Sequence, residues 1–246
     1  MRRFFFDPAS RCGEQVTLTA DESKHVTKVL RLKPGTEVEL LDGLGRVFSG
    51  EICSTGKWVQ VDITGILIDS QETLGHLRVL QAMLKGDKMD SVVQKCTELG
   101  VVEMVPFHSS RCQGKLNSSI AEKKHGRWQR IGLAACKQCF RPKPMSIVSP
   151  ISINDALTRR AADSDSSLKL LFWEEERQVR LQDIEGIEGA DSIEILLGPE
   201  GGISEEEVAQ AKTNGWQTVS LGENVLRAET ATVTAVSIVQ FLSGRL

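Results

Sequence analysis

Residues 193–207 read IEILLGPEGGISEEE, and this stretch indicates the fold more clearly than any other part of the chain. Its apolar start is typical of a buried strand, and the glycine-rich part that follows is typical of a tight loop. Ser204 and Glu207 then form the Ser-x-x-Glu pattern of a capping box, which predicts that a helix begins there. A strand, a glycine loop and a helix in this order are how α/β proteins hold a nucleotide-like ligand.

The loop itself indicates which kind of nucleoside it would accept. It lacks the Gly-x-Gly-x-x-Gly spacing of dinucleotide-binding proteins, and it has no lysine before a serine or threonine as in a phosphate-binding loop. Glu200 lies in its middle, and a carboxylate there would repel a phosphate group. The loop therefore suits an adenosine-type ligand that has no phosphates and carries positive charge. S-adenosylmethionine, with its sulfonium and ammonium groups, fits this description.

The composition is that of an ordinary globular protein of one or two domains, with 246 residues and a formal net charge of −3. No apolar run is long enough to span a membrane. Asp7 and Pro8 end the apolar N-terminal stretch too early for a signal peptide, so we expect a cytoplasmic protein. Cys136 and Cys139 form a C-x-x-C pair, but a zinc site needs a second pair, and we expect no metal.

Charge is distributed unevenly along the chain. Residues 111–143 carry nine basic side chains against the single acid Glu122, whereas residues 174–207 carry twelve acids against two arginines. A polyanion partner at the basic stretch would explain this asymmetry. A solvated helix face would explain it equally well, so the composition leaves both interpretations open.

The pattern of apolar residues changes near residue 72 and predicts two domains, 1–72 and 73–246. The first contains short alternating strands, a hairpin signal at residues 42–45 and one helix, which favour a small β-barrel. In the second, strands alternate with helices, and this order predicts a parallel sheet covered by helices, hence an α/β fold. The strands expected in the second domain lie at residues 77–83, 101–105, 168–173, 193–197 and 218–221.

Three of the expected strand ends resemble one another: residues 172–174, 198–202 and 221–227. Ligands of α/β sheets bind at the carboxyl ends of strands, so these three loops are expected to surround one adenosine. Arg227 and Glu229 follow at a helix start, where a cation is disfavoured by the helix dipole. An arginine there indicates a substrate contact or a buried pairing, and the alternative is an ordinary surface Arg–Glu pair.

Five segments, in one order, give the chain a resemblance to the RsmE family: residues 1–5, 25–35, 88–100, 198–204 and 226–231. Members of that family methylate N3 of a uridine in the 16S ribosomal RNA of the small ribosomal subunit. The resemblance implies a PUA-like β-barrel followed by a SPOUT methyltransferase domain with a trefoil knot. It also implies a homodimer with S-adenosylmethionine as cofactor. Asn224 stands where the family commonly has a basic residue, and Ala228 where it has threonine.

The resemblance implies roles for particular residues. Arg227 and Glu229 are the expected catalytic residues. Glu229 or Glu200 would assist loss of the uracil N3 proton, or Arg227 would stabilise the developing anion, and the residues do not decide between these. The cofactor-binding residues are expected to be Phe172, Leu197, Gly198, Glu200, Gly201, Gly202, Leu221, Gly222, Leu226 and Thr230. The RNA-binding residues are expected to be Arg3, His25, Arg31, Arg111, Arg127, Arg130 and Arg141.

A rival hypothesis from another class is a non-catalytic RNA-binding factor for ribosome assembly that retains the SPOUT fold. Such a factor need not bind S-adenosylmethionine, so binding of that cofactor separates the two hypotheses. A dehydrogenase is disfavoured because the dinucleotide fingerprint is missing. The terminal helix, residues 228–242, is apolar on two sides, which is typical of core or of an oligomer interface.

Overall fold

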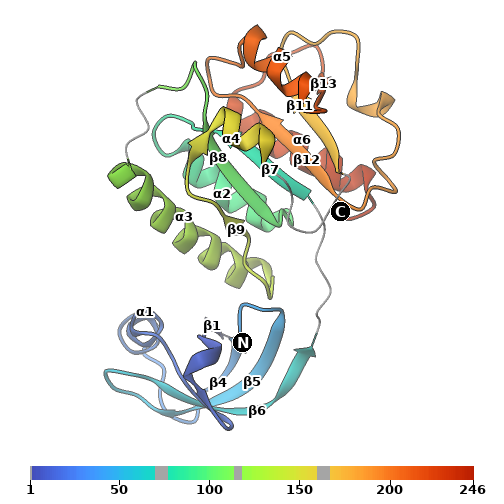
Figure 1. Ribbon diagram of the computed structural model, residues 1–246. Coiled ribbons are helices and arrows are strands. Elements are labelled where there is room, and N and C mark those ends of the chain that lie inside the picture. Colours follow the sequence, from blue (N-terminus) through green and yellow to red (C-terminus); the bar gives the residue numbers. More distant parts are fainter. Residues whose placement is uncertain (1, 70–76, 114–117, 160–166) are drawn as a thin grey trace. The chain divides into compact units, whose positions relative to one another are not determined.

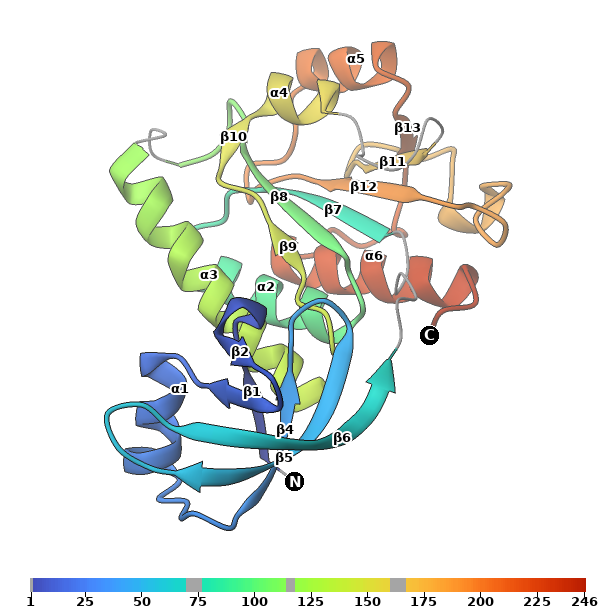
Figure 2. The ribbon, with the colours of Figure 1, turned by 60° about the horizontal axis from the view of Figure 1, so that its bottom comes forward.

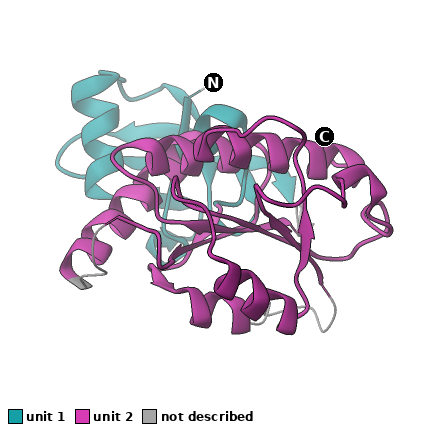
Figure 3. Cartoon of the chain, turned by 90° about the horizontal axis from the view of Figure 1, so that it is seen from above, with its two compact units in different colours: residues 1–73, 136–144 teal, residues 74–135, 145–246 magenta. Residues whose placement is uncertain are grey.

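The structure is a computed structural model that describes residues 2–69, 77–113, 118–159 and 167–246. The chain divides into two compact units, and each is described by itself (Figure 3). The first unit comprises residues 1–73 together with residues 136–144, and the second comprises residues 74–135 and 145–246. The segment 136–144 thus lies outside the range 1–72 that was expected for the first domain. The predicted boundary between residues 72 and 73 lies within residues 70–76, which the structure does not describe.

A six-stranded sheet with the order β1-β4-β5-β6-β3-β2 forms the first unit. The β1–β4 pair is parallel, and the remaining neighbours are antiparallel. Bulges in β5 against β6 bend the sheet into the predicted barrel-like form, around a core that includes Phe4, Leu40 and Phe48. The strands are β1 (Arg2–Phe5), β2 (Arg11–Cys12), β3 (Gln15–Thr17), β4 (Glu37–Leu41), β5 (Arg46–Ser54) and β6 (Gln60–Asp69).

The first unit also contains helical turns between its strands. A 3-10 turn spans Pro8–Ser10, and α1 (Ala20–Lys24) continues as a wider π-helical turn over His25–Val29. Thr19 caps α1, because its hydroxyl accepts a hydrogen bond from the amide of Glu22 at 3.4 Å.

Residues 136–144 are bound into the first unit by side chains. Lys137 forms an ion pair with Glu22, and the Arg3 guanidinium lies 3.9 Å from the centroid of the Phe140 ring. Arg3 also pairs with Glu39 at 2.6 Å.

In the second unit, a parallel sheet has the order β10-β8-β7-β12-β11-β13, with β9 also paired to β8. Every neighbouring pair runs parallel, so the predicted α/β fold is confirmed. The trefoil knot implied by the family resemblance stays a prediction. The strands are β7 (Leu77–Ala82), β8 (Glu103–His108), β9 (Ser146–Ile147), β10 (Ile151–Ser152), β11 (Leu168–Phe172), β12 (Ile193–Leu197) and β13 (Gln217–Val219).

One predicted strand is shifted along the chain. The strand expected at residues 101–105 runs instead over Glu103–His108. Gly100, with φ of +84°, ends the preceding helix, and the amide of Val101 still bonds to the carbonyl of Cys96 in that helix at 3.0 Å. Because the amide of Val101 is still bonded to the helix, this residue belongs to the helix end, and the strand begins at Glu103.

Helices cover both faces of the parallel sheet (Figures 1 and 2). On one face, α2 (Lys88–Glu98) and α6 (Ala228–Leu242) share a core with Trp128 of α3 (Ser118–Cys139). On the other face, α4 (Ile153–Thr158) and α5 (Glu205–Thr213) pack over a second core. A 3-10 turn at Leu181–Asp183 packs on the side of α2 and α6.

A buried polar contact joins α6 to the central strand β7. Gln81, with a side chain that is 0% exposed, accepts a hydrogen bond at Oε1 from the Thr232 hydroxyl at 2.5 Å. Its Nε2 donates to the carbonyl oxygens of Ala82 at 3.0 Å and of Gly198 at 3.4 Å. Gln81 therefore links β7, α6 and the loop that follows β12.

Replacing Thr232 with valine is expected to lower the free energy of unfolding by about 1–3 kcal/mol, because the buried oxygen of Gln81 would lose its donor. Valine keeps the shape of threonine, so packing changes little. Thr230→Val, at an exposed position of the same helix, is the control and is expected to change stability by less than about 0.5 kcal/mol. Urea denaturation measures both, and equal stabilities of the two variants would contradict the role given to Gln81.

Candidate active site

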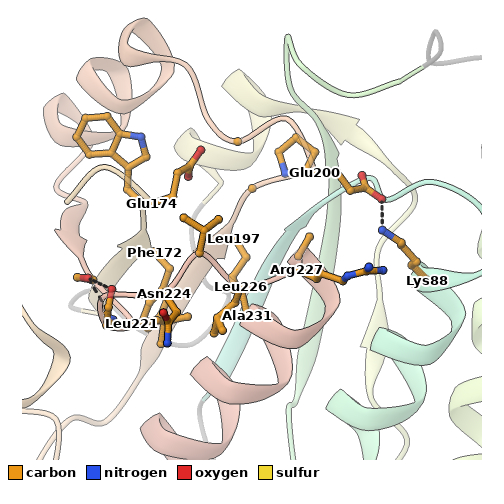
Figure 4. A pocket seen from close by; sticks show the side chains of 18 of the residues that line it. Lys88, Phe172, Glu174, Leu197, Glu200, Leu221, Asn224, Leu226, Arg227 and Ala231 are labelled. Atoms are coloured by element: carbon orange, nitrogen blue, oxygen red, sulfur yellow. Dashed lines mark hydrogen bonds and ion pairs between the residues drawn. The ribbon is translucent and has the colours of Figure 1, made fainter. Parts of the chain in front are cut away.

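A pocket lies at the carboxyl ends of β11, β12 and β13 (Figure 4). Its walls are the three segments that follow these strands, with the first residues of α2 and α6 at one side. The strand order explains this arrangement, since β11 pairs with β12 on one side and with β13 on the other. The three strand ends that resemble one another in the sequence are thus brought together.

The loop after β12 has the conformation that its glycines allow. The amide of Gly202 donates to the carbonyl of Pro199 at 2.9 Å, which closes a tight turn. Gly202 has φ of +72°, and a Cβ at this position would collide with the carboxylate of Glu174. The positive φ therefore favours glycine here, and a Cβ would in addition force the flexible end of Glu174 to move.

The predicted capping box at the start of α5 is confirmed. The Ser204 hydroxyl accepts from the amide of Glu207 at 3.3 Å, and the Glu207 carboxylate accepts from the amide of Ser204 at 3.1 Å. The other oxygen of Glu207 accepts from the amide of Ser110 at 2.7 Å. The cap thus anchors the glycine loop at its far end.

The predicted cofactor-binding residues divide into two groups. Those that line the pocket are Phe172, Leu197, Gly198, Glu200, Gly202, Leu221, Gly222 and Leu226. Gly201 and Thr230 are not part of the lining: the carbonyl of Gly201 accepts from Arg111 at 3.2 Å, and Thr230 is exposed on α6. Asn224 and Ala228, the two departures from the family pattern, both line the pocket.

The lining also contains Glu174, from the loop 172–174 that was expected to surround the ligand, and Lys88 and Arg177, which the sequence did not indicate. Lys88 could have been found by the reasoning used for Arg227, because it too is a cation at a helix start. Arg177 lies beyond the loop 172–174, and only its position after the end of β11 points to it.

Lys88 bridges two carboxylates at the pocket. Its Nζ lies 3.0 Å from Oε1 of Glu200 and 3.3 Å from Oε2 of Glu229, and the amide of Lys85 donates to the same Glu200 oxygen at 3.2 Å. Partial burial acts to raise the pKa of Glu200, but hydrogen bonds from its own backbone amide and from Lys88 outweigh it and hold that pKa below its ordinary value. The hydrogen bond to Glu200 is the main cause that raises the pKa of Lys88.

Arg227 is the N-terminal flanking residue of α6, and its side chain is exposed in the pocket. Figure 4 shows this side chain extending toward the side where Lys88 and Glu200 lie. Within the described ranges, no carboxylate lies at ion-pair distance from Arg227. The Arg–Glu pair that the sequence suggested is therefore absent there, because Glu229 pairs with Lys88 instead.

The arginines predicted to bind RNA differ in exposure. Arg31, Arg111, Arg127 and Arg130 are exposed, although Arg127 pairs with Asp90. His25 is half-buried, edge-on to Phe4.

Two arginines of the predicted RNA-binding set lie largely inside the first unit. The side chain of Arg3 is 12% exposed and Arg141 is 7% exposed, and desolvation by burial lowers the pKa of Arg141. As placed, these two guanidiniums are poorly accessible to a phosphate, so the structure gives the RNA-binding prediction less support there.

Among residues 2–69, 77–113, 118–159 and 167–246, no group of three or more His, Cys, Asp or Glu side chains is arranged to hold a metal ion. None of the helices in the described ranges is long and apolar enough to cross a membrane.

Two families match the chain. A family described as an RNA methyltransferase domain matches residues 70–240, and one described as an RNA methyltransferase PUA domain matches residues 18–62. Among curated proteins, the ribosomal RNA small subunit methyltransferase E of Bacillus subtilis is 27% identical, over 98% of this chain and 96% of that protein. The protein of the same name from Aquifex aeolicus is 30% identical, over 95% of this chain and 97% of its own.

Solved structures resemble the whole chain. The ribosomal RNA small subunit methyltransferase E of Neisseria gonorrhoeae, bound to S-adenosyl methionine, has a TM-score of 0.86 and 31% identity and covers 98% of each chain. A putative methyltransferase of Legionella pneumophila, also with S-adenosylmethionine bound, has a TM-score of 0.87 and 30% identity, covering 97% of this chain and 96% of its own.

Gly202→Ala is expected to destabilise the protein by at least about 1–2 kcal/mol, the cost of a left-handed conformation for a residue with a Cβ. The new methyl group would also displace the Glu174 carboxylate. Gly189→Ala is the matched control, since a Cβ there meets open space and its φ is not positive, and it should be neutral or stabilising by up to about 1 kcal/mol. Thermal unfolding compares the two, and equal melting temperatures would show that the loop tolerates a Cβ at residue 202.

Proposed function

This chain belongs to the RNA methyltransferase family, and we propose on that premise that it methylates N3 of one uridine in the 16S RNA of the small ribosomal subunit. The cofactor is S-adenosylmethionine, and the cytoplasm is the proposed site of action. The observation that carries the proposal is the pocket at the ends of β11, β12 and β13. It lies in a chain whose solved relatives hold S-adenosylmethionine and share nearly its full length.

The residues of the pocket fit this cofactor. Gly198 lets the loop pack tightly on itself beside the pocket, because a Cβ there would come within 3.1 Å of Ile203 and 3.3 Å of the backbone of Gly202. Phe172, Leu197 and Leu226 would pack on the adenine ring, and Glu174 would offer a carboxylate to the cationic part of the cofactor. When bound, the cofactor supplies the electrophilic methyl group.

Methylation at N3 also requires that the uracil ring lose its imide proton. Glu200 is a poor proton acceptor, because Lys88 and backbone amides hold its pKa below the ordinary value. Glu229 shares the ammonium of Lys88. Arg227, in contrast, is a cation with no carboxylate paired to it within the described ranges. We therefore assign Arg227 to the anion that develops on the uracil oxygens, with the proton leaving to solvent.

The first unit and the exposed arginines would hold the RNA. The PUA domain match covers residues 18–62, and Arg31 is exposed beside the helical turn at His25–Val29. Arg111 and Arg130 are exposed on the second unit. Contacts of this kind with phosphates position an RNA and supply most of the affinity.

A homodimer is part of the proposal. Ile238 and Phe241 of α6 are 37% and 67% exposed, although their neighbours Val239 and Gln240 are buried. Two exposed large apolar side chains one turn apart on a helix are typical of a subunit interface.

The substrate assignment predicts a gene-dependent mark on the RNA. A methyl group at N3 blocks Watson–Crick pairing, so reverse transcription across 16S RNA should stop at one uridine in cells that contain this gene. The stop should be absent in cells that lack the gene and should return when the gene is restored. Identical profiles in the two strains would contradict the assignment to 16S RNA.

For Arg227→Ala, we expect kcat to fall by about 10²–10³-fold, the usual effect of removing one group that stabilises a developing anion. The affinity for S-adenosylmethionine, measured by calorimetry, should change little. Arg245→Ala, an exposed arginine of the same unit outside the pocket lining, is the control for loss of one positive charge. A kcat for Arg227→Ala within about twofold of the control would remove Arg227 from the reaction.

A further inference from the structure

We propose that Lys88 is a positioning residue that acts as the counter-ion of Glu200 and Glu229 and so keeps Arg227 free for the substrate. The inference rests on the proposed function, because it concerns how the same pocket prepares Arg227. Three carboxylates and three cations line or flank the pocket: Glu174, Glu200, Glu229, Lys88, Arg177 and Arg227. The pairing of these cations with these carboxylates determines which cation remains available to the substrate.

Lys88 reaches both carboxylates from a third element. It is the first residue of α2, Glu200 belongs to the loop after β12, and Glu229 lies in the first turn of α6. Its Nζ is 3.0 Å from Oε1 of Glu200 and 3.3 Å from Oε2 of Glu229. One ammonium group therefore joins two walls of the pocket.

Stability does not explain why a lysine stands here. The side chains of Lys88, Glu200 and Glu229 are 34%, 32% and 26% exposed, and ion pairs of such exposure contribute little to folding. The N-terminus of α2 is moreover an unfavourable place for a cation. The arrangement is better explained by its effect on the charges inside the pocket.

Arg227 is the residue that this arrangement affects. It flanks α6 two positions before Glu229, lines the pocket, and has no ion-pair partner within the described ranges. Figure 4 shows its side chain extending toward the Lys88–Glu200 pair. If Lys88 were neutral, both carboxylates would attract Arg227, and an arginine held by carboxylates would no longer face the uracil ring.

The same arrangement predicts a particular pH dependence. Without the ammonium of Lys88, Glu200 and Glu229 would repel each other, and the pKa of one of them would rise. Lowering the pH would then protonate that carboxylate and release Arg227. Glu174, Arg177 and the backbone amide of Lys85 also face this region and are unchanged in the variant, so a difference between the wild type and the variant reports on Lys88.

The first test compares Lys88→Met with Lys88→Arg and with Lys95→Met. Lys95 pairs with Glu98 at 3.1 Å on the same helix, outside the pocket lining, and serves as the matched control. For Lys88→Met we expect kcat for methyl transfer to fall about tenfold or more, with the KM for S-adenosylmethionine changed less than about threefold. Lys88→Arg should retain most of the activity, and Lys95→Met should match the wild type.

The pH profile separates positioning from a general structural defect. The ratio of wild-type kcat to Lys88→Met kcat should be largest near pH ~8 and should shrink toward pH ~5.5, where carboxylates with a raised pKa become protonated. A ratio that is constant across this range, or a Lys88→Met kcat equal to that of Lys95→Met, would overturn the proposal.

A second measurement does not depend on activity. Arg227 is exposed, so phenylglyoxal should label it in the wild type, with exposed Arg31 as the internal reference for mass spectrometry. In Lys88→Met, labelling of Arg227 relative to Arg31 should slow several-fold, and in Lys88→Arg and Lys95→Met it should not. Unchanged labelling in Lys88→Met overturns the inference. A wild type that labels as expected but methylates no small-subunit RNA would instead overturn the proposed function.

Discussion

The site depends on the parallel pairing of β12 with β7 on one side and with β11 on the other. All five residues of β12 are buried, which is what a strand covered by helices on both faces requires. Because β11 also pairs with β13, the carboxyl ends of three strands lie side by side at one edge of the sheet. The pocket forms there because parallel strands that end together also direct their following loops to the same place.

Electrostatics then distinguishes this pocket from a generic nucleoside site. The loop after β12 suggested a cationic ligand from sequence, because Glu200 would repel a phosphate. The structure places the cations Lys88, Arg177 and Arg227 in the same lining as Glu200 and Glu174. The position of Lys88 adds what the sequence did not suggest, because it neutralises Glu200 and Glu229 and leaves Arg227 unpaired among the described residues. This pairing supports the proposal that Arg227 stabilises the developing anion, because both candidate bases are paired with Lys88.

In the first unit, local sequence patterns predicted the secondary structure but not all of the segments that pack together. Alternating strands, a hairpin and one helix were predictable in residues 1–72, and they form a sheet and a helix there. The sequence did not indicate that residues 136–144 also join this unit. Lys137 with Glu22 and Arg3 with Phe140 make that connection, and both pairs join residues that are more than a hundred positions apart. The same packing largely buries Arg3 and Arg141, which had been expected at an RNA surface.

By itself, the sequence determined the elements whose signals are local. The capping box of Ser204 and Glu207, the glycine at residue 202 and the terminal helix Ala228–Leu242 were all predictable, because hydrogen bonds, φ angles and apolar spacing act within a few residues. Only the tertiary structure decided that Lys88 contacts Glu200, 112 residues away, and that Glu229 pairs with Lys88 and not with Arg227. The physical reason is that such contacts follow from the order of strands in the sheet, which no spacing along the chain encodes.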